Sequence, residues 1–296
     1  MRRRMPESRH LPKPAWLKRK LPSGSDYEAM RQFISSKKLN TVCKEANCPN
    51  RFECYQKGTA TFMILGDHCT RNCRFCAVQP GILSAPDDDE PKRVAEAIKD
   101  MGLSYAVITS VTRDDLSDGG ADMFARTIRV VRKLNPQIRV EVLVPDFKGD
   151  ASAIRVVVTE KPDVFGHNME TVKRLYPKAR PEAIYERSLD VLRTAKTIRA
   201  DQLTKSGIMV GIGETLDEIK ETFDDLVQSG CDMLSIGQYL SPSKTHLPVK
   251  EYISPDTFIH LKEIARQSGL KQVASGPFVR SSFEASGLFH SLQVEF

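Results

Sequence analysis

The sequence predicts an α/β fold, a partial (β/α)6 barrel of the TIM type with an N-terminal cysteine-rich extension. Six short apolar runs alternate with six segments of helical periodicity, the order expected of a parallel sheet covered by helices. At 296 residues, the chain is long enough to bury the large core of one such barrel with small appendages. Six units fall short of the eight in a complete barrel, so we expect a closed or nearly closed sheet.

The predicted strands are the apolar runs, at residues 59–66, 105–111, 139–144, 163–168, 206–213 and 233–240. The first of them, TATFMILG, is β-branched and apolar, which predicts a buried strand. The predicted helices lie at residues 91–102, 119–136, 151–160 and 181–199, from residue 215 onward, and at 255–268. Pro91 favours the start of the first helix, and Thr215 with Glu218 forms a capping-box signature at the fifth.

Three parts are expected along the chain. Residues 1–58 form a basic arm and a cysteine-bearing segment, residues 59–275 form the barrel, and residues 276–296 form a C-terminal segment that caps the site. Active sites of such barrels lie at the carboxyl ends of the strands, so the chemistry is expected there.

The net charge of +6 is concentrated in the arm, because residues 1–20 hold eight Lys or Arg against one Glu. Such an arm binds an acidic partner or remains a solvated tail. The sequence contains no aromatic-interleaved basic patch and no long apolar stretch, so neither nucleic acid nor a membrane is the expected partner. Seven cysteines without a secretory signal indicate a reducing compartment, by default the cytoplasm.

Six of the seven cysteines form two groups, the first triplet (Cys43, Cys48 and Cys54) and the second triplet (Cys69, Cys73 and Cys76). Clustered thiols in a reducing compartment are metal ligands more often than disulfides. Three thiolates on a four-iron cluster leave one iron open to a small molecule, whereas four suit electron transfer. Two incomplete sets therefore predict two [4Fe–4S] clusters that take part in chemistry.

The second triplet lies in GDHCTRNCRFCAV, directly after the first predicted strand. Its spacing lets one short loop wrap three corners of a cluster, and Phe75 is placed to pack against a nucleoside. A zinc site with His68 as fourth ligand is the alternative. This CxxxCxxC spacing resembles that of the radical S-adenosylmethionine enzymes. The resemblance implies that the open iron binds S-adenosylmethionine, which is cleaved to a 5′-deoxyadenosyl radical.

Two further stretches bear on this resemblance. GIMVGIGE at 207–214 fits the pattern GxIxGxxE, with Met209 at the Ile position, and implies that Gly211 lies against the adenine. SVTRDDLSDGG at 110–120 stands where that family usually has Gly-Gly-Glu, so the ligands of the methionine amino group stay open. Glu141 and Asn168, expected at strand ends, are candidates for contacts with S-adenosylmethionine or ordinary buried polar residues.

The first triplet has intervals of four and five residues. Zinc, or unrelated small core residues, are the alternatives. Placed just ahead of the second triplet, this spacing resembles the lipoyl synthase family, as do EANCPNRFECY, FGHNMETVKRLYPKARP, SIGQYLSPSKTHLPV and GPFVRSSF. The resemblance implies an auxiliary four-iron cluster on the first triplet, with Ser282 as its fourth ligand and Ser281 as the fallback. Phe283 stands where the family usually has Tyr.

The resemblance also implies the reaction and its partners. Two sulfur atoms enter at carbons six and eight of an octanoyl group on a lysine of a carrier domain, with the auxiliary cluster as sulfur donor. The carriers are lipoyl domains of 2-oxo-acid dehydrogenase complexes and the glycine-cleavage carrier protein. An electron donor such as ferredoxin or flavodoxin and cluster-assembly proteins are further implied partners.

Some alternatives remain open from the sequence. Lys244 and His246, just after the sixth predicted strand, face substrate or order their loop. A biotin-synthase-like enzyme acting on a small molecule is the nearest alternative function, although the RSSF stretch and the first-triplet spacing disfavour it. A two-cluster electron carrier and a zinc-dependent binding module are alternatives of another class.

Overall fold

A single large sheet organises the molecule. The computed structural model describes residues 11–18, 25–81 and 83–294, so most of the basic arm lies outside the described residues. Within these ranges the sheet has eight strands in the order β1-β2-β5-β6-β7-β8-β9-β10. The strands are β1 (Asn40–Thr41), β2 (Thr61–Ile64), β5 (Tyr105–Ser110), β6 (Arg139–Leu143), β7 (Val164–Gly166), β8 (Thr204–Val210), β9 (Met233–Gln238) and β10 (Gln272–Gly276).

Strands β2 to β10 are parallel to their neighbours, whereas β1 runs antiparallel to β2. The predicted α/β barrel is therefore confirmed, and each of the six predicted strands is present. In the described part of the chain, β10 adds one parallel strand that the sequence did not predict. Strands β1 and β10 are the edges of the sheet there, so the barrel is open between them.

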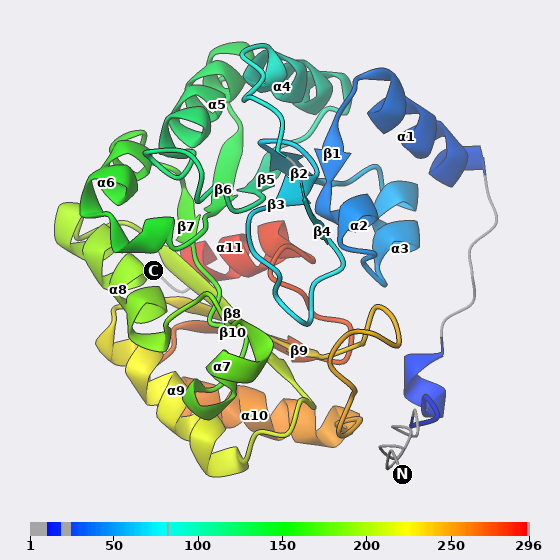
Figure 1. Cartoon of the computed structure of the whole chain (residues 1–296), viewed down its shortest axis with the longest axis vertical. Coiled ribbons are helices and arrows are strands. Elements are labelled where there is room, and N and C mark those ends of the chain that lie inside the picture. The colour runs from blue at the N-terminus through cyan, green and yellow to red at the C-terminus, as the bar shows by residue number, and fades with distance from the viewer. Residues whose placement is uncertain (1–10, 19–24, 82, 295–296) are drawn as a thin grey trace, which may run out of the picture.

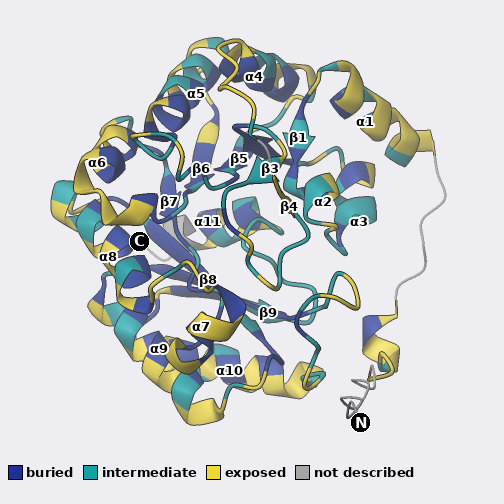
Figure 2. Ribbon diagram, viewed as in Figure 1, coloured by how far each residue is buried: buried dark blue, intermediate teal, exposed yellow. Residues whose placement is uncertain are grey.

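Helices cover the outside of the sheet (Figure 1). They are α4 (Glu90–Asp100), α5 (Ala121–Leu134), α6 (Ala151–Thr159), α8 (Tyr185–Ile198), α9 (Leu216–Gln228) and α10 (Pro255–Gln267). The sequence places their starts: Pro91 opens α4, and the Thr215–Glu218 capping box opens α9. Figure 2 shows buried residues on the strands and inner helix faces and exposed residues on the outer faces.

The strands turn alternate side chains toward the helices and toward the barrel interior. Ile108 and Val142 are fully buried in the core between sheet and helices. The interior is more polar: Glu141 of β6 forms an ion pair with Lys205 of β8, at 2.8 Å, across the intervening β7. Both side chains are only 3% exposed. This buried pair is therefore one in which each charge offsets the cost of burying the other.

The N-terminal segment is attached to one edge of the sheet. Helix α1 (Ser25–Ser36) leads to β1, and short helices α2 (Val42–Glu45) and α3 (Arg51–Gln56) follow. Thr41 accepts a hydrogen bond from the Lys44 backbone N–H, which caps α2, and its hydroxyl also pairs with the Tyr55 hydroxyl at 2.9 Å. The first triplet is thus fixed to β2 through β1.

Helix α11 (Ala285–Val294) closes the amino-terminal end of the barrel. Its Phe289 packs on Tyr105, the first residue of β5, with ring centroids 5.6 Å apart. Phe289 also joins a buried cluster with Val164 and Met233, the first residues of β7 and β9. Figure 1 shows this helix within the outline of the barrel.

Shorter elements complete the described structure: the 3-10 helices Ala15–Leu17, Phe147–Gly149 and Lys173–Leu175, helix α7 (Tyr176–Ala179), and the paired strands β3 (His68–Cys69) and β4 (Gln79–Pro80). In the described ranges, no helix combines the length and apolar character needed to cross a membrane.

Candidate active site

The second triplet lies in a loop that leaves the carboxyl end of β2 and closes on itself. The pairing of β3 with β4 joins Cys69 to Pro80 and so brings the two ends of the loop together. This is the end of the barrel where the sequence places the second triplet. Each cysteine of the triplet is partly exposed and reduced.

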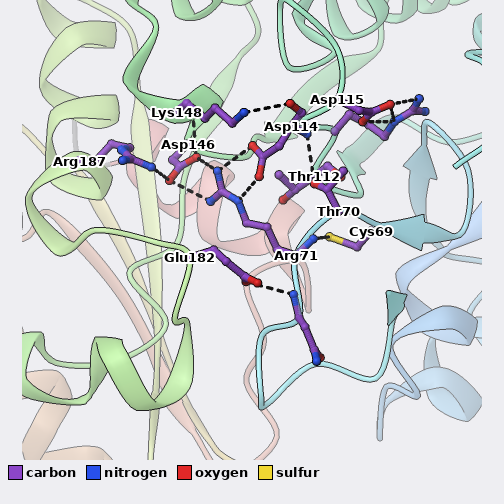
Figure 3. A network of polar contacts seen from close by, with 12 residues as sticks. Cys69, Thr70, Arg71, Thr112, Asp114, Asp115, Asp146, Lys148, Glu182 and Arg187 are labelled. Carbon is purple, nitrogen blue, oxygen red and sulfur yellow. Dashed lines mark hydrogen bonds and ion pairs between the residues drawn. The ribbon is translucent and has the colours of Figure 1, made fainter. Parts of the chain in front are cut away.

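Arg71, between Cys69 and Cys73, fixes this loop to two strand ends (Figure 3). Its guanidinium donates two hydrogen bonds to Asp114, at 2.6 and 2.9 Å, and two to Asp146, at 2.6 and 3.0 Å. Asp114 follows β5 and Asp146 follows β6, so one side chain ties three loops together. Arg71 is 5% exposed and the Asp146 side chain 0%.

The electrostatics of this network favour the charged pair. Burial alone would raise the pKa of the Asp146 carboxyl, but the hydrogen bonds and charge of Arg71 outweigh burial and lower it. The Arg71 pKa is likewise raised by its two aspartates against the opposing effect of burial. Arg71 also places its backbone N–H 3.4 Å from the Cys69 sulfur. Such N–H donors stabilise negative charge on a thiolate and on the cluster it binds.

Other strand-end loops hold the rest of the cysteine loop. The Arg74 backbone N–H donates to Ala179 O at 2.9 Å, and the Arg74 carbonyl accepts from the Leu247 N–H at 2.9 Å. His246 Nε2 lies 2.9 Å from its partner, the Cys76 carbonyl oxygen. His246 therefore contacts the cysteine loop from the loop after β9, and its Nδ1 lies 2.8 Å from Ser243 Oγ within its own loop. The thiols are held in place by the surrounding protein.

Charged and polar groups at the end of β7 adjoin the second triplet. Burial raises the pKa of Cys73 to about 11, while the Arg180 charge opposes the shift. Burial also raises the pKa of Cys76 to about 12. Arg180 donates to the Asn168 carbonyl at 2.9 Å, and its charge opposes the increase that burial causes in the pKa of Glu170. The partly buried Glu170 carboxylate and the buried Arg180 guanidinium thus lie next to the thiols.

The structure places some, but not all, of the remaining predicted contacts for S-adenosylmethionine at strand ends. Phe75 is partly buried and packs on the hydrophobic cluster that includes β8 and β9. Asn168 follows β7, as expected. The predicted position of Glu141 at a strand end is wrong: it lies mid-strand in β6, paired with Lys205 and accepting a hydrogen bond from Tyr105 at 2.6 Å. Its side chain is therefore engaged within the barrel.

Gly211 lies in a turn that the protein packs tightly. Its φ is +95°, and a side-chain carbon there would come within 2.3 Å of both Gln238 Nε2 and the Glu251 carbonyl. Glu214 accepts the backbone N–H groups of Gly211, Ile212 and Gly213. The glycine and glutamate of GxIxGxxE therefore stabilise the turn itself, and a contact between Gly211 and adenine stays a prediction.

The first triplet lies at the other end of the barrel. A cavity of about 170 Å³ is lined by Cys43, Cys48 and Cys54 together with Thr61 and Tyr105, which begin β2 and β5. The prediction that the chemistry belongs at the carboxyl ends of the strands is wrong for this cavity. The N-terminal segment reaches the sheet antiparallel to β2, so the residues after β1 arrive at the amino-terminal end of β2.

The two adjacent serines of the C-terminal segment have different surroundings. Ser282 lines the cavity of the first triplet. Ser281 instead donates a hydrogen bond from Oγ to Asn168 Oδ1 at 2.9 Å. The position of Ser282, rather than that of Ser281, suits a fourth ligand beside the three thiols. Phe283 also lines the cavity.

The first-triplet cavity fits a four-iron cluster in the chemistry of its lining. Its three cysteine thiols are the soft ligands that iron–sulfur clusters take. Burial raises the pKa of Cys43 to about 12 and that of Cys54 to about 11. Among the described residues, no three His, Cys, Asp or Glu side chains converge on a single metal ion. A cubane does not require such convergence, because each thiolate binds a different iron.

Sequence reasoning missed four side chains at these sites: Arg71, Asp146, Arg180 and Glu170. Arg71 lay within the recognised loop, but its partners are 43 and 75 residues away. A signal for Asp146 and Glu170 exists in the placement of charged residues just after β6 and β7, where strand ends meet at one face. Arg180 directly follows α7 and carries no such signal.

Two family models match different parts of the chain. The model of the radical SAM superfamily matches residues 63–226, and the model of the N-terminal domain of lipoyl synthase matches residues 1–48. Lipoyl synthase of Desulfotalea psychrophila is 52% identical over 97% of this chain and 96% of that protein. Lipoyl synthase of Caldicellulosiruptor saccharolyticus is 55% identical over 92% of this chain and 96% of that protein.

Solved structures share the fold at low identity. HydG, a maturase of the [FeFe]-hydrogenase, superposes with a TM-score of 0.57 at 14% identity, over 91% of this chain and 75% of that chain. Methylornithine synthase gives a TM-score of 0.53 at 12% identity, over 79% and 80%. Streptococcus suis SuiB bound to S-adenosylmethionine gives 0.53 at 13% identity, over 81% and 51%.

Proposed function

Because this chain belongs to the lipoyl synthase family of the radical SAM superfamily, we propose that its two cysteine triplets hold two four-iron clusters with separate tasks. The chain is a radical SAM enzyme that inserts two sulfur atoms, at carbons six and eight, into protein-bound octanoyl groups. The second triplet, at the carboxyl ends of the strands, takes the cluster that works with S-adenosylmethionine. The first triplet and Ser282 take the auxiliary cluster, which donates sulfur.

One observation carries this assignment: Ser282 lines the cavity of the first triplet, although it lies 228 residues after Cys54 in the sequence. Among the described residues, its hydroxyl has no hydrogen-bond partner, so it is available as a ligand. A serine oxygen is a hard ligand and is displaced from a soft iron–thiolate cluster more easily than a thiolate. A cluster with one labile corner suits a donor that must give up sulfide.

When bound, the cofactors supply a 5′-deoxyadenosyl radical, which the unactivated methylene C–H bonds of the substrate require because they have no acidic proton. The protein supplies placement. Arg71 fixes the second-triplet loop to the ends of β5 and β6. Arg180 and Glu170 provide charged groups next to Cys73, and Phe75 provides an aromatic surface beside Cys76.

The barrel interior separates the two triplets, so the acyl chain has to lie between them. Glu141, Lys205 and Tyr105 form a closed set of hydrogen bonds there. Because Glu141 and Lys205 are paired with each other, neither side chain presents an unpaired charge to the acyl chain. Helix α11 closes the amino-terminal end and limits the access of water to the first-triplet cavity.

The proposed function also implies which proteins interact with this chain. The octanoylated carriers are lipoyl domains of 2-oxo-acid dehydrogenase complexes and the glycine-cleavage carrier protein. Ferredoxin or flavodoxin supplies electrons, and cluster-assembly proteins rebuild the auxiliary cluster. Reduced thiols are needed for both clusters, which supports a cytoplasmic location. The basic arm at residues 1–20 docks the carrier domain by charge.

The docking role has its own test. Deletion of residues 2–20 is expected to reduce turnover of a whole octanoyl domain more than turnover of an octanoyl-lysine peptide. The reason is that a peptide lacks the acidic surface of the folded carrier. Equal losses, or no loss, would remove the docking role.

Anaerobic purification with iron and sulfide analysis tests the proposed function. About eight irons and eight sulfides per chain are expected for two such clusters. Replacing the second triplet by alanines should leave about half of the iron and abolish cleavage of S-adenosylmethionine. Replacing the first triplet should also leave about half, keep that cleavage, and abolish the lipoyl product. A colourless zinc protein, or lipoyl formation without the first triplet, would contradict the proposal.

A further inference from the structure

Ser281 and Ser282 are neighbours whose hydroxyls serve different parts of the molecule. Ser281 Oγ donates to Asn168 Oδ1 at 2.9 Å, and Asn168 Nδ2 donates to Glu170 Oε1 at 3.0 Å. The backbone carbonyl of Asn168 accepts from Arg180 Nη1 at 2.9 Å. Asn168 therefore has fixed partners on both ends of its side chain and on its backbone, and the Ser281 hydroxyl binds to a rigid acceptor.

The C-terminal segment at residues 278–283 lies against the sheet at two glycines. A side-chain carbon on Gly207 of β8 would lie 2.6 Å from Ser281 Oγ and 2.8 Å from Asn168 Oδ1. One on Gly237 of β9 would lie 2.1 Å from the Val279 carbonyl oxygen. Any other residue at either position would displace the C-terminal segment. The path of this segment therefore depends on the absence of a side chain at Gly207 and at Gly237.

A second anchor lies beside the first triplet. Asn50, which lines the cavity and is 1% exposed, donates from Nδ2 to the Phe278 carbonyl at 2.7 Å. The segment is thus bound at Phe278 by the N-terminal extension and at Ser281 by the barrel. Ser282 follows the second anchor directly, so its position in the cavity is set by that anchor.

We propose that Ser281 is a positioning residue: its hydrogen bond to Asn168 is a latch that holds the C-terminal segment so that Ser282 reaches the auxiliary cluster. The proposal rests on the proposed function in taking Ser282 as the ligand. It goes beyond that function in giving the two serines separate duties. It also gives Asn168, at the carboxyl end of β7, a structural role beside Arg180 and Glu170.

The latch can be tested in the apoprotein, where no cluster contributes. Amide hydrogen exchange of residues 278–283 is expected to rise roughly twofold to tenfold in Ser281→Ala, the range that one neutral hydrogen bond contributes. Asn168→Ala should give at least that rise, because it removes the same bond and also the bond from Asn168 to Glu170. Ser282→Ala and the exposed control Ser291→Ala should leave the exchange unchanged. Unchanged exchange in Ser281→Ala, or an equal rise in Ser282→Ala, would overturn the latch.

The holoprotein gives a second readout. A chelator should remove the first iron of the auxiliary cluster roughly twofold to tenfold faster in Ser281→Ala than in the parent protein. Because both substitutions remove the bond between Ser281 and Asn168, the Ser281→Ala/Asn168→Ala double variant should release iron no faster than Asn168→Ala alone. Additive rate increases, or a parental rate in both single variants, would overturn the proposal.

The two hypotheses fail in different ways. If the parent protein binds two clusters but forms no lipoyl product, the proposed function fails. If the parent protein is active and the Ser281 and Asn168 variants match it in hydrogen exchange and iron release, only the latch fails.

Discussion

Arg71 shows how one buried charge orders a loop that must hold three thiols. Asp114 and Asp146 reach it from two different strand ends, and Arg187 approaches Asp146 at 3.4 Å from α8. A buried ion pair adds little net stability over apolar packing, but removal of one partner leaves an uncompensated buried charge. The arginine is therefore required once the aspartates are present.

Replacing Arg71 by Met is expected to destabilise the apoprotein by about 3 kcal/mol, the lower end for a broken buried pair, because Asp146 loses its closest partner and keeps only the longer ion pair with Arg187 at 3.4 Å. Arg71→Lys should recover part of that loss, since a lysine keeps the charge but not the bidentate geometry. Anaerobic urea unfolding measures both. In the holoprotein, Arg71→Met should also release the second-triplet iron faster than the auxiliary iron.

Arg113→Lys is the matched control for Arg71, since Arg113 is 3% exposed and pairs with Asp115 of its own loop. It should leave the release of iron from the second triplet at the parental rate. Parental cluster retention in Arg71→Met would show that the loop does not depend on the network.

His167 makes stability depend on pH. Burial, with the Arg180 charge, lowers its pKa from 6.5 to about 4. The unfolded chain therefore binds the extra proton between pH 6.5 and pH 4, and stability falls as pH decreases through that window. The full effect is on the order of 3 kcal/mol. Urea unfolding of the apoprotein at several pH values should show this slope.

His167→Gln is expected to flatten that slope. The exposed His260→Gln is the control and should keep it, because its side chain is 61% exposed. A slope unaltered in His167→Gln would assign the pH dependence to other groups.

Among the elements, the two edge strands explain how distant segments meet. Strand β1 leads directly into the first triplet, and β10 leads directly into the C-terminal segment at residues 278–283. The segments that follow the two edge strands of the open sheet therefore line the same cavity. Helix α11 follows and packs on the first residues of β5, β7 and β9.

Gly237→Ala is expected to displace the C-terminal segment, because its added carbon would meet the Val279 carbonyl at 2.1 Å. The auxiliary cluster should lose iron faster, while cleavage of S-adenosylmethionine at the second triplet persists. Iron release and 5′-deoxyadenosine formation, measured side by side, separate the two effects.

Gly287→Ala, on α11, is the control for this substitution. Nothing lies within 4 Å of its added carbon, and alanine favours a helix over glycine by about 1 kcal/mol. This variant should keep both clusters and gain slight thermal stability. Equal iron retention in both glycine variants would contradict the requirement for glycine at residue 237, where the C-terminal segment contacts β9.

Local patterns predicted the elements whose signals are local. The capping box at Thr215 and the proline of α4 marked helix starts correctly, and the apolar runs marked six strands. Strand β10, with the sequence QVASG, is short and made of small or polar residues, so no apolar run identified it. Helix α11 was missed because ASGLFHSLQV has little polar periodicity.

In the whole molecule, the sequence predicted which residues form each triplet and where the second triplet lies, but not where the first triplet lies. The position of the first triplet at the amino-terminal end depends on the antiparallel pairing of β1 with β2, a contact between distant segments. The resemblance implied Ser282 rather than Ser281 as the ligand, and the path of the C-terminal segment over Gly207 and Gly237 supplies a physical reason for that choice. Both the position of the first triplet and this path depend on long-range packing, which local sequence patterns do not contain.

The predicted division of the chain at residues 58 and 275 stays a prediction. Hydrogen bonds cross both boundaries: β1 pairs with β2, and Asn50 binds the Phe278 carbonyl. The extension, barrel and C-terminal segment therefore contribute jointly to the first-triplet cavity. Activity is expected to need all three parts in one chain.

Isotope transfer tests the central claim most directly. The auxiliary cluster is rebuilt with labelled sulfide, excess sulfide is removed, and one turnover is run on an octanoylated carrier domain. Mass spectrometry of the carrier should find the label in both sulfur atoms of the product, with a matching loss of cluster sulfide. Unlabelled lipoyl product formed while the auxiliary cluster stays intact would contradict the account.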